Sequence, residues 1–206
     1  MKKYCILLLL LSGCSLLPTP KTEPVHLYLF ETYPTIKNNR SAKTIAISTP
    51  TSQPGFDTPQ IAYQRQALTL SYFLYHRWVD TPAHMLKPLL VQTLDPYFVI
   101  LPQMASHSLA DIQINTELVS LKQNFIDHPS HVDLQLRIQI IDVKNNHVIS
   151  SRLFNEMQPA ATEDAYGGVI ATNLALHRIL IEVLNYVLLT TGSHEVEREV
   201  VTDVFE

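Results

Sequence analysis

Apolar and polar residues alternate along the second half of the chain. Segment 111–118 carries Ile, Ile, Thr and Leu at every second position, and segment 132–140 repeats this with Val, Leu, Leu, Ile and Ile. After a turn at Asn145–Asn146 the alternation continues through Ile149, Ser151 and Leu153. A period of two places alternate side chains on opposite faces of a strand. We therefore expect an antiparallel meander of three strands, with these apolar residues inward and their neighbours in water.

Shorter apolar runs in the first half of the chain predict further strands. They are rich in branched and aromatic residues and lie at 25–30, 43–49, 61–65, 68–75 and 98–101. The runs 61–65 and 68–75 are so close that only a tight connection or one bent strand fits between them. Residues 48–59 hold three prolines and one glycine and predict a loop.

Helical spacing begins after the aromatic run. Thr81 and Pro82 mark a helix start, as N-cap and first helical residue. Pro88 lacks an N–H, so we expect an irregularity inside this helix, which ends near Asp95-Pro96. Its apolar face consists of Leu86, Leu89, Leu90, Thr93 and Leu94.

A longer helix is predicted from Thr162 to a C-terminal cap at Gly192. Charged residues interrupt its hydrophobicity, which favours a core helix over a membrane span. Its broad apolar face would hold Tyr166, Val169, Ile170, Leu174, His177, Leu180, Ile181, Leu184 and Leu188. The elements together predict a single α+β domain over residues 25–192, a mainly antiparallel sheet with two helices packed on one face.

The N-terminus has a different character. Lys2 and Lys3 precede a short apolar run, which is too short to span a bilayer and is typical of a secretory signal peptide. The sequence Leu11-Ser12-Gly13-Cys14 that follows resembles the bacterial lipobox. That resemblance implies cleavage after residue 13 and lipidation of Cys14. The alternative is an ordinary signal peptide with a chance cysteine nearby.

Two or three acyl chains on Cys14 would anchor the protein to a membrane permanently. Ser15, rather than aspartate, after the cysteine favours the outer membrane under enteric-type sorting. Residues 14–24 hold three prolines and predict an extended tether about 30 Å long. Residues 193–206 predict an acidic, flexible tail.

Composition narrows the function classes. The chain has 15 basic and 19 acidic residues, and removal of 1–13 leaves 13 against 19, which disfavours nucleic-acid binding. No thiol remains for a disulfide, a zinc site or catalysis once Cys5 is removed and Cys14 is lipidated. His128 and His131 could bind a metal with Asp127 or Asp133, but a solvated loop fits this pattern better. No motif for a metalloprotease, a serine hydrolase or a nucleotide cofactor is present.

An ordered set of residues in the region 55–86 resembles the auxiliary lipoproteins of ABC-type transport systems, in particular the PqiC-like group that accompanies MCE-type lipid transporters. Tyr28 and Leu29 loosely match the opening strand of that group. Two departures are His76, where the group often has Asn or Glu, and Asn145–Asn146, where it often has Gly. The matching residues are Gly55, Ile61, Tyr63, Arg65, Tyr72, Tyr75, Trp78, Pro82, Met85 and Leu86.

The resemblance implies a non-enzymatic component of a system that moves phospholipid or similar hydrophobic molecules between the inner and outer membranes. It implies no cofactor. The chain would dock the MCE-type periplasmic protein at the outer membrane, facing the periplasm, and would assemble as a ring of identical subunits. Two other functions stay open, a regulator of a peptidoglycan enzyme and a carrier that holds a lipid itself. A deep apolar cavity between helix and sheet would favour the carrier, and a packed core with an aromatic surface patch would favour docking.

Aromatic residues and arginine are enriched among the residues that anchor protein interfaces. Tyr63 and Arg65 share one face of a predicted strand, so we expect them to face a partner or a neighbouring subunit. The alternative is that they belong to the core of the sheet. Trp78 would pack under the helix that begins at Pro82. The structural signature is then Tyr72, Trp78, Pro82, Met85 and Leu86.

Overall fold

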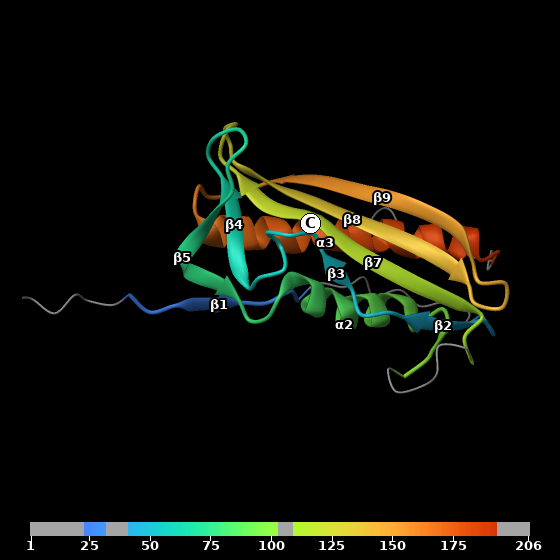
Figure 1. Ribbon diagram of the computed structural model, residues 1–206. Helices are drawn as coiled ribbons and strands as arrows, with labels where there is room; N and C mark the ends of the chain where they lie inside the picture. The colour runs from blue at the N-terminus through green and yellow to red at the C-terminus, as the bar shows by residue number, and fades with distance from the viewer. Residues whose placement is uncertain (1–22, 32–40, 103–108, 193–206) are drawn as a thin grey trace, which may run out of the picture.

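The computed structural model describes residues 23–31, 41–102 and 109–192, which form one α+β domain (Figure 1). Two helices and a nine-stranded sheet make up this part of the chain. In chain order the elements are β1 (His26–Tyr28), β2 (Thr44–Ile47), β3 (Thr51–Ser52), β4 (Gln60–Gln64), β5 (Ser71–Trp78), α2 (Pro82–Leu94), β6 (Val99–Ile100), β7 (Ile112–Asn124), β8 (His131–Asp142), β9 (His147–Pro159) and α3 (Ala165–Thr190).

The predicted meander is present and is the longest part of the sheet. Strands β7, β8 and β9 pair antiparallel along almost their whole lengths. Buried and half-buried residues alternate along β7 and β8, because every second side chain enters the core. Asn146 takes a left-handed backbone with φ of 50° at the turn between β8 and β9, a conformation that asparagine tolerates.

The expectation of a mainly antiparallel sheet holds only in part, since the longest pairings are antiparallel but the sheet is mixed. Five of its strand pairings are parallel and three are antiparallel. The physical reason lies in the free edge of β7, which is long enough to receive three short strands in succession. β2 pairs with Ile112–Ile114, β3 with Glu117–Leu118 and β4 with Gln123–Asn124, all parallel to β7.

The predicted inward face of β9 is also wrong. Ile149 is 39% exposed and Ser151 is exposed, whereas Phe154 is buried opposite Leu136. A register shift between Ile140 and Ile141 changes which β9 residues lie opposite the inward residues of β8. A slip of one residue moves a whole strand's side chains to the other face.

Both helices contribute to one hydrophobic core with the inward face of β7 and β8. α2 runs unbroken through Pro88, and the Thr81 hydroxyl makes no capping hydrogen bond although Thr81 is the N-cap residue. α3 is capped by Asp164, whose side chain accepts a hydrogen bond from the Gly167 N–H at 2.8 Å. Fully buried residues of this core include Leu86, Leu90 and Leu94 of α2, Ile114, Leu136 and Ile138 of the sheet, and Leu176, Leu180 and Val183 of α3.

α3 is long and apolar enough to cross a membrane, but 61% of its apolar span is buried inside the domain. The predicted apolar face of this helix was too broad. Tyr166, Ile170 and Leu174 are 57%, 39% and 46% exposed, because they lie outside the arc that contacts the sheet.

Candidate partner-binding surface

Three aromatic rings in tilted and edge-to-face contact gather with one arginine at the end of strand β4. The ring centroid of Tyr63 lies 4.6 Å from that of Phe73 and 6.0 Å from that of Phe125. The guanidinium carbon of Arg65 lies 5.6 Å from the Tyr63 centroid and 5.2 Å from the Phe125 centroid. We call these four residues the aromatic–arginine cluster. Its rings are half-buried and Arg65 is exposed, so aromatic surface with a cation beside it faces solvent.

The cluster occupies the helix-covered face of the sheet, just beyond the start of α3. Tyr63 pairs with Gln123 across the parallel β4–β7 ladder, so the two side chains point to the same face. Gln123 is buried directly against Gly168 in the first turns of α3. Phe125 follows Gln123 by two residues and continues the same face. The cluster is thus the part of this face that α3 does not reach.

Arg65 keeps its hydrogen-bonding capacity for another molecule. Within the described ranges no carboxylate lies within ion-pair distance of it. By contrast, Arg137, Arg152 and Arg178 each pair with a glutamate of this chain. A guanidinium presents five N–H donors in a rigid fork that matches a carboxylate. Arg65 is therefore suited to an acidic group on a partner.

The loop that joins β4 to β5 adds exposed apolar side chains beside the cluster. Leu68 is 102% exposed and has φ of 64°, a left-handed conformation that a leucine rarely adopts. Leu70 and Ile126 are 39% and 45% exposed. In Figure 1 the β4–β5 loop lies beside the β7–β8 connection at the top of the view, and the Phe125 N–H donates to the Gln64 carbonyl at 2.8 Å. Strain and apolar exposure at one loop tip are typical of a binding surface.

A second group of rings extends the cluster towards α3. His76 lies 5.9 Å from Phe73, 5.2 Å from His26 and 5.8 Å from Tyr28 between ring centroids. The Tyr28 hydroxyl and Nδ1 of His76 share a hydrogen bond of 2.9 Å. Burial, and then the nearby His26, lowers the pKa of His76. Burial, with Asp164 as the next cause, raises the pKa of Tyr28. His76 therefore stays neutral and Tyr28 keeps its proton near neutral pH, so this pair adds no charge to the surface.

The residues of the structural signature occupy different places in the fold. The Tyr72 hydroxyl donates to the Gly55 carbonyl at 3.0 Å, and Gly55 has φ of 91°, which favours glycine. Trp78 is 3% exposed, its ring lies 4.9 Å from Phe30, and with Gly168 and Thr172 of α3 it lines a small internal space. In α2, Pro82 is the first residue, Met85 packs partly buried against the core and Leu86 is fully buried.

Cys14 lies outside the described residues, together with most of the tether 14–24 and the tail 193–206. Its lipidation stays a prediction from the sequence.

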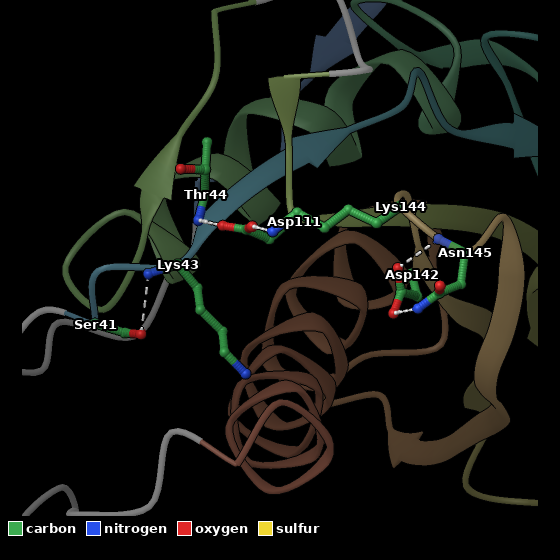
Figure 2. A network of polar contacts seen from close by, with 7 residues as sticks. All are labelled: Ser41, Lys43, Thr44, Asp111, Asp142, Lys144 and Asn145. Carbon is green, nitrogen blue, oxygen red and sulfur yellow. Dashed lines mark hydrogen bonds and ion pairs between the residues drawn. The ribbon is translucent and has the colours of Figure 1, made fainter.

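The opposite end of the domain is polar and internally satisfied (Figure 2). The Asp111 carboxylate accepts hydrogen bonds from Lys144 Nζ at 2.8 Å and from the Thr44 N–H at 3.0 Å. The bond from Lys144 is the main cause that lowers the pKa of Asp111, and the bond from Thr44 is the next. Asn145 donates two hydrogen bonds to Asp142 and lowers its pKa too. Lys43 reaches the Thr191 carbonyl at the C-terminal end of α3, where a cation is favoured. This network joins β2, β7 and the β8–β9 turn, and its role is structural.

The histidines considered for a metal site have separate partners. His131 is 3.3 Å from Asp133, and His128 is 3.8 Å from Glu163. Among the residues whose placement is described, no three His, Cys, Asp or Glu side chains come together as a metal site would require.

The sequence interpretation named Tyr63 and Arg65, and it included Phe73 only as one of several aromatic residues near Arg65; it missed Phe125. Phe125 lies at the end of β7 and meets Tyr63 only through the parallel β4–β7 pairing, which no local pattern predicts. Phe73 was part of the aromatic run 68–75, but it was not separated there from its neighbours. The alternation of 111–118 gives no signal for Phe125, because the register shift between Leu118 and Ser120 reverses which residues face inward before the strand ends.

Solved structures share this fold. A crystal structure of a Xanthomonas campestris protein, described by a DUF330 family model, has a TM-score of 0.73 at 15% identity, covering 82% of this chain and 98% of that one. An uncharacterised protein has a TM-score of 0.65 at 11% identity, covering 80% and 99%. A hypothetical protein from Chlamydia trachomatis has a TM-score of 0.53 at 10% identity, covering 75% and 100%. These similarities concern the fold alone.

No curated protein sequence matches this chain. A family model does, and it spans residues 28–183, from β1 into the last turns of α3, so that it includes both the aromatic–arginine cluster and the signature residues. The match agrees with the resemblance expected from the sequence. The chain belongs to the family described as the ABC-type transport auxiliary lipoprotein component.

Proposed function

We propose that this chain is a non-enzymatic lipoprotein of an MCE-type ABC transport system that moves lipids or similar hydrophobic molecules between the inner and outer membranes. Cys14 would anchor it to the outer membrane, facing the periplasm. The aromatic–arginine cluster would bind the MCE-type periplasmic protein, while partner chains would supply the ATP-driven step and the lipid path. Its membership of a lipoprotein family supports a location in the cell envelope.

The observation that carries the proposal is Arg65, which lies over the rings of Tyr63 and Phe125 and has no ion pair with any carboxylate whose placement is described. An arginine held against aromatic rings loses less freedom on binding than a free side chain, so its contact with a partner carboxylate costs less entropy. The neighbouring Leu68 is fully exposed and would gain by burial in an interface. Arginine and aromatic residues with an apolar rim are the usual composition of an interface anchor.

A lipid carrier of the enclosed type has less support. Where Trp78 lies between the sheet and α3, the internal space measures about 10 Å³. A space of that size holds at most a single water molecule. The core residues on both sides of it are packed, so an acyl chain would have to displace them.

Co-purification from gently solubilised membranes tests the proposal. Tagged wild-type protein should retain the MCE-type periplasmic protein encoded by the same organism, and Arg65→Glu should lose it, because the new charge repels the carboxylate that Arg65 attracts. Arg65→Lys should retain part of the binding, since lysine keeps the charge but not the planar fork.

Arg152→Ala is the matched control. Arg152 also lies over two rings, 4.7 Å from the Phe154 centroid and 6.0 Å from the Tyr186 centroid, but on β9. It should co-purify with the partner as wild type does. Equal retention by wild type and Arg65→Glu would contradict the proposed surface. A peptidoglycan synthase in place of the MCE-type protein would favour the regulator alternative.

A further inference from the structure

An apolar groove lies between strand β1 and the N-terminal half of α3. Leu27 of β1 and Leu29 just after this strand line one side, and Tyr166, Val169, Ile170 and Leu174 line the other from α3. Its volume is about 540 Å³, and it is open to solvent along its length. Leu27 and Leu29 are 62% and 47% exposed, so each leaves apolar area in water that an occupant would cover.

The row of residues 166, 170, 174, 178 and 182 on α3 changes from apolar to charged along the helix. Its first half carries Tyr166, Ile170 and Leu174 at intervals of four residues, and the next positions of the same row are Arg178 and Glu182. The charged half is partnered inside the domain, because Arg178 pairs with Glu156 at 2.7 Å and Glu182 pairs with Arg152 at 3.6 Å. The apolar half lies beside β1, and the two elements line the groove together.

Hydrogen bonds and a ring contact join the two walls of the groove. Asn173 of α3 accepts a hydrogen bond from the Glu31 N–H at 3.0 Å and donates one to the Leu29 carbonyl at 3.5 Å. The Tyr28 and Tyr166 rings lie 6.3 Å apart. These contacts hold the chain after β1 against α3.

The position of the groove indicates its occupant. Leu27 follows Cys14 by only thirteen residues, which reach about 40 Å when fully extended in a proline-rich chain. β1 enters the domain beside the first turns of α3, since Tyr28 contacts Tyr166 and Leu29 contacts Asn173. β1 is the described element that follows the lipid anchor most closely in sequence, and the part of α3 beside β1 is apolar and exposed.

We propose that this groove rests in the acyl region of the membrane leaflet that holds the lipid anchor. Leucine, isoleucine and valine side chains gain free energy there, and tyrosines such as Tyr166 favour the membrane–water boundary. Among the described residues, the lining includes no lysine or arginine and one acidic residue, Glu31, so we expect the contact to depend on apolar burial and not on anionic headgroups. The anchor would then hold the domain in one orientation. The inference rests on the lipid anchor and not on the partner of Arg65.

A fluorescent label tests this proposal on the lipidated chain in vesicles. A thiol introduced by Ile170→Cys carries an environment-sensitive dye, and the vesicles contain phosphatidylcholine with brominated acyl chains, which quench a dye only on close contact. Asn185→Cys, an exposed position farther along α3, is the matched control. Leu174→Cys is a second reporter in case Ile170→Cys folds poorly.

The label at 170 should be quenched several-fold more strongly than the label at 185, and the label at 174 should agree with it. Quenching should stay the same when phosphatidylglycerol replaces part of the phosphatidylcholine. Equal or absent quenching at 170 and 185 would overturn the proposal, as would quenching that requires anionic lipid. A blue shift at 170 without quenching would also overturn it, because a second copy of the chain or a partner protein would then cover the groove. None of these outcomes depends on the partner bound at Arg65.

Discussion

Truncation of Trp78 and of Arg65 should affect different properties of the protein. Trp78 is 3% exposed and packs within the core beside Phe30. Its replacement by alanine leaves a cavity in the core. Such truncations of a buried tryptophan lower the free energy of unfolding by roughly 3 to 5 kcal/mol. In a domain of this size that loss corresponds to a fall in melting temperature of roughly 6 to 20 °C.

Arg65→Ala removes only two exposed cation–π contacts. Such contacts contribute about 1 kcal/mol or less at exposed sites, so the melting temperature should fall by no more than about 4 °C. Arg152→Ala removes contacts with Phe154 and Tyr186 and also the half-exposed ion pair with Glu182, which together contribute about 2 kcal/mol or less, so it should cause a fall of no more than about 8 °C. The three variants thus separate a packing role from a surface role.

Binding should rank the variants differently. Loss of an interface anchor costs about 2 kcal/mol or more, so Arg65→Ala should weaken binding of the MCE-type protein by about 30-fold. Arg152→Ala should bind as wild type does. Thermal unfolding followed by circular dichroism, and titration of the purified partner, measure both quantities on the same samples. An Arg65→Ala variant that unfolds like Trp78→Ala, or that binds with wild-type affinity, would refute the reasoning.

Three further predictions concern the anchor and the start of α3. Cys14→Ser should leave unprocessed precursor or released protein, and membrane fractionation would contradict this if the variant were processed and still tightly bound. Gly167→Ala should destabilise the fold, although Gly→Ala in a helix usually stabilises it by about 1 kcal/mol, because the new Cβ would lie 2.2 Å from the Thr162 carbonyl oxygen; a raised melting temperature would show that the helix start can shift. Asp164→Ala should cost about 1 kcal/mol at neutral pH through loss of the N-cap. Hydrogen bonds from the Gly167 N–H, and then from Thr162, lower the pKa of Asp164 below 3.8, so this stabilisation is present above pH 3.8 and is lost as the pH falls through the lower folded-state pKa. Denaturant unfolding of wild type and Asp164→Ala between pH 7 and pH 3 should show that the difference in their unfolding free energies shrinks. A constant difference would contradict the ionic part of the cap.

Local patterns predicted the local parts of this fold. The alternation in 111–118 and 132–140 identified β7 and β8, and Thr81-Pro82 marked the first residue of α2 correctly. Both signals depend on neighbours within a few residues, so they can be read from one sequence. The long helix that ends near Gly192 was found in the same way.

Non-local pairing explains what the sequence did not predict. β2, β3 and β4 reach β7 across long stretches of chain, so nothing in their own sequences distinguishes parallel from antiparallel pairing. The face of β9 depends on a register shift opposite Ile140, which the alternation of β9 cannot reveal. The aromatic–arginine cluster was incomplete in the sequence interpretation for the same reason. Phe125 contacts Arg65 from the end of a different strand.

Site-specific photo-crosslinking in living cells tests the central claim most directly. A photoreactive amino acid at Leu68, fully exposed beside the aromatic–arginine cluster, should crosslink the chain to the MCE-type periplasmic protein. The same amino acid at Val148, an exposed apolar position on β9, should not. Identification of the crosslinked product by mass spectrometry decides the result. A product with the MCE-type protein from position 68 alone is the outcome that we predict, and its absence from position 68, or an equal yield from position 148, would contradict the account.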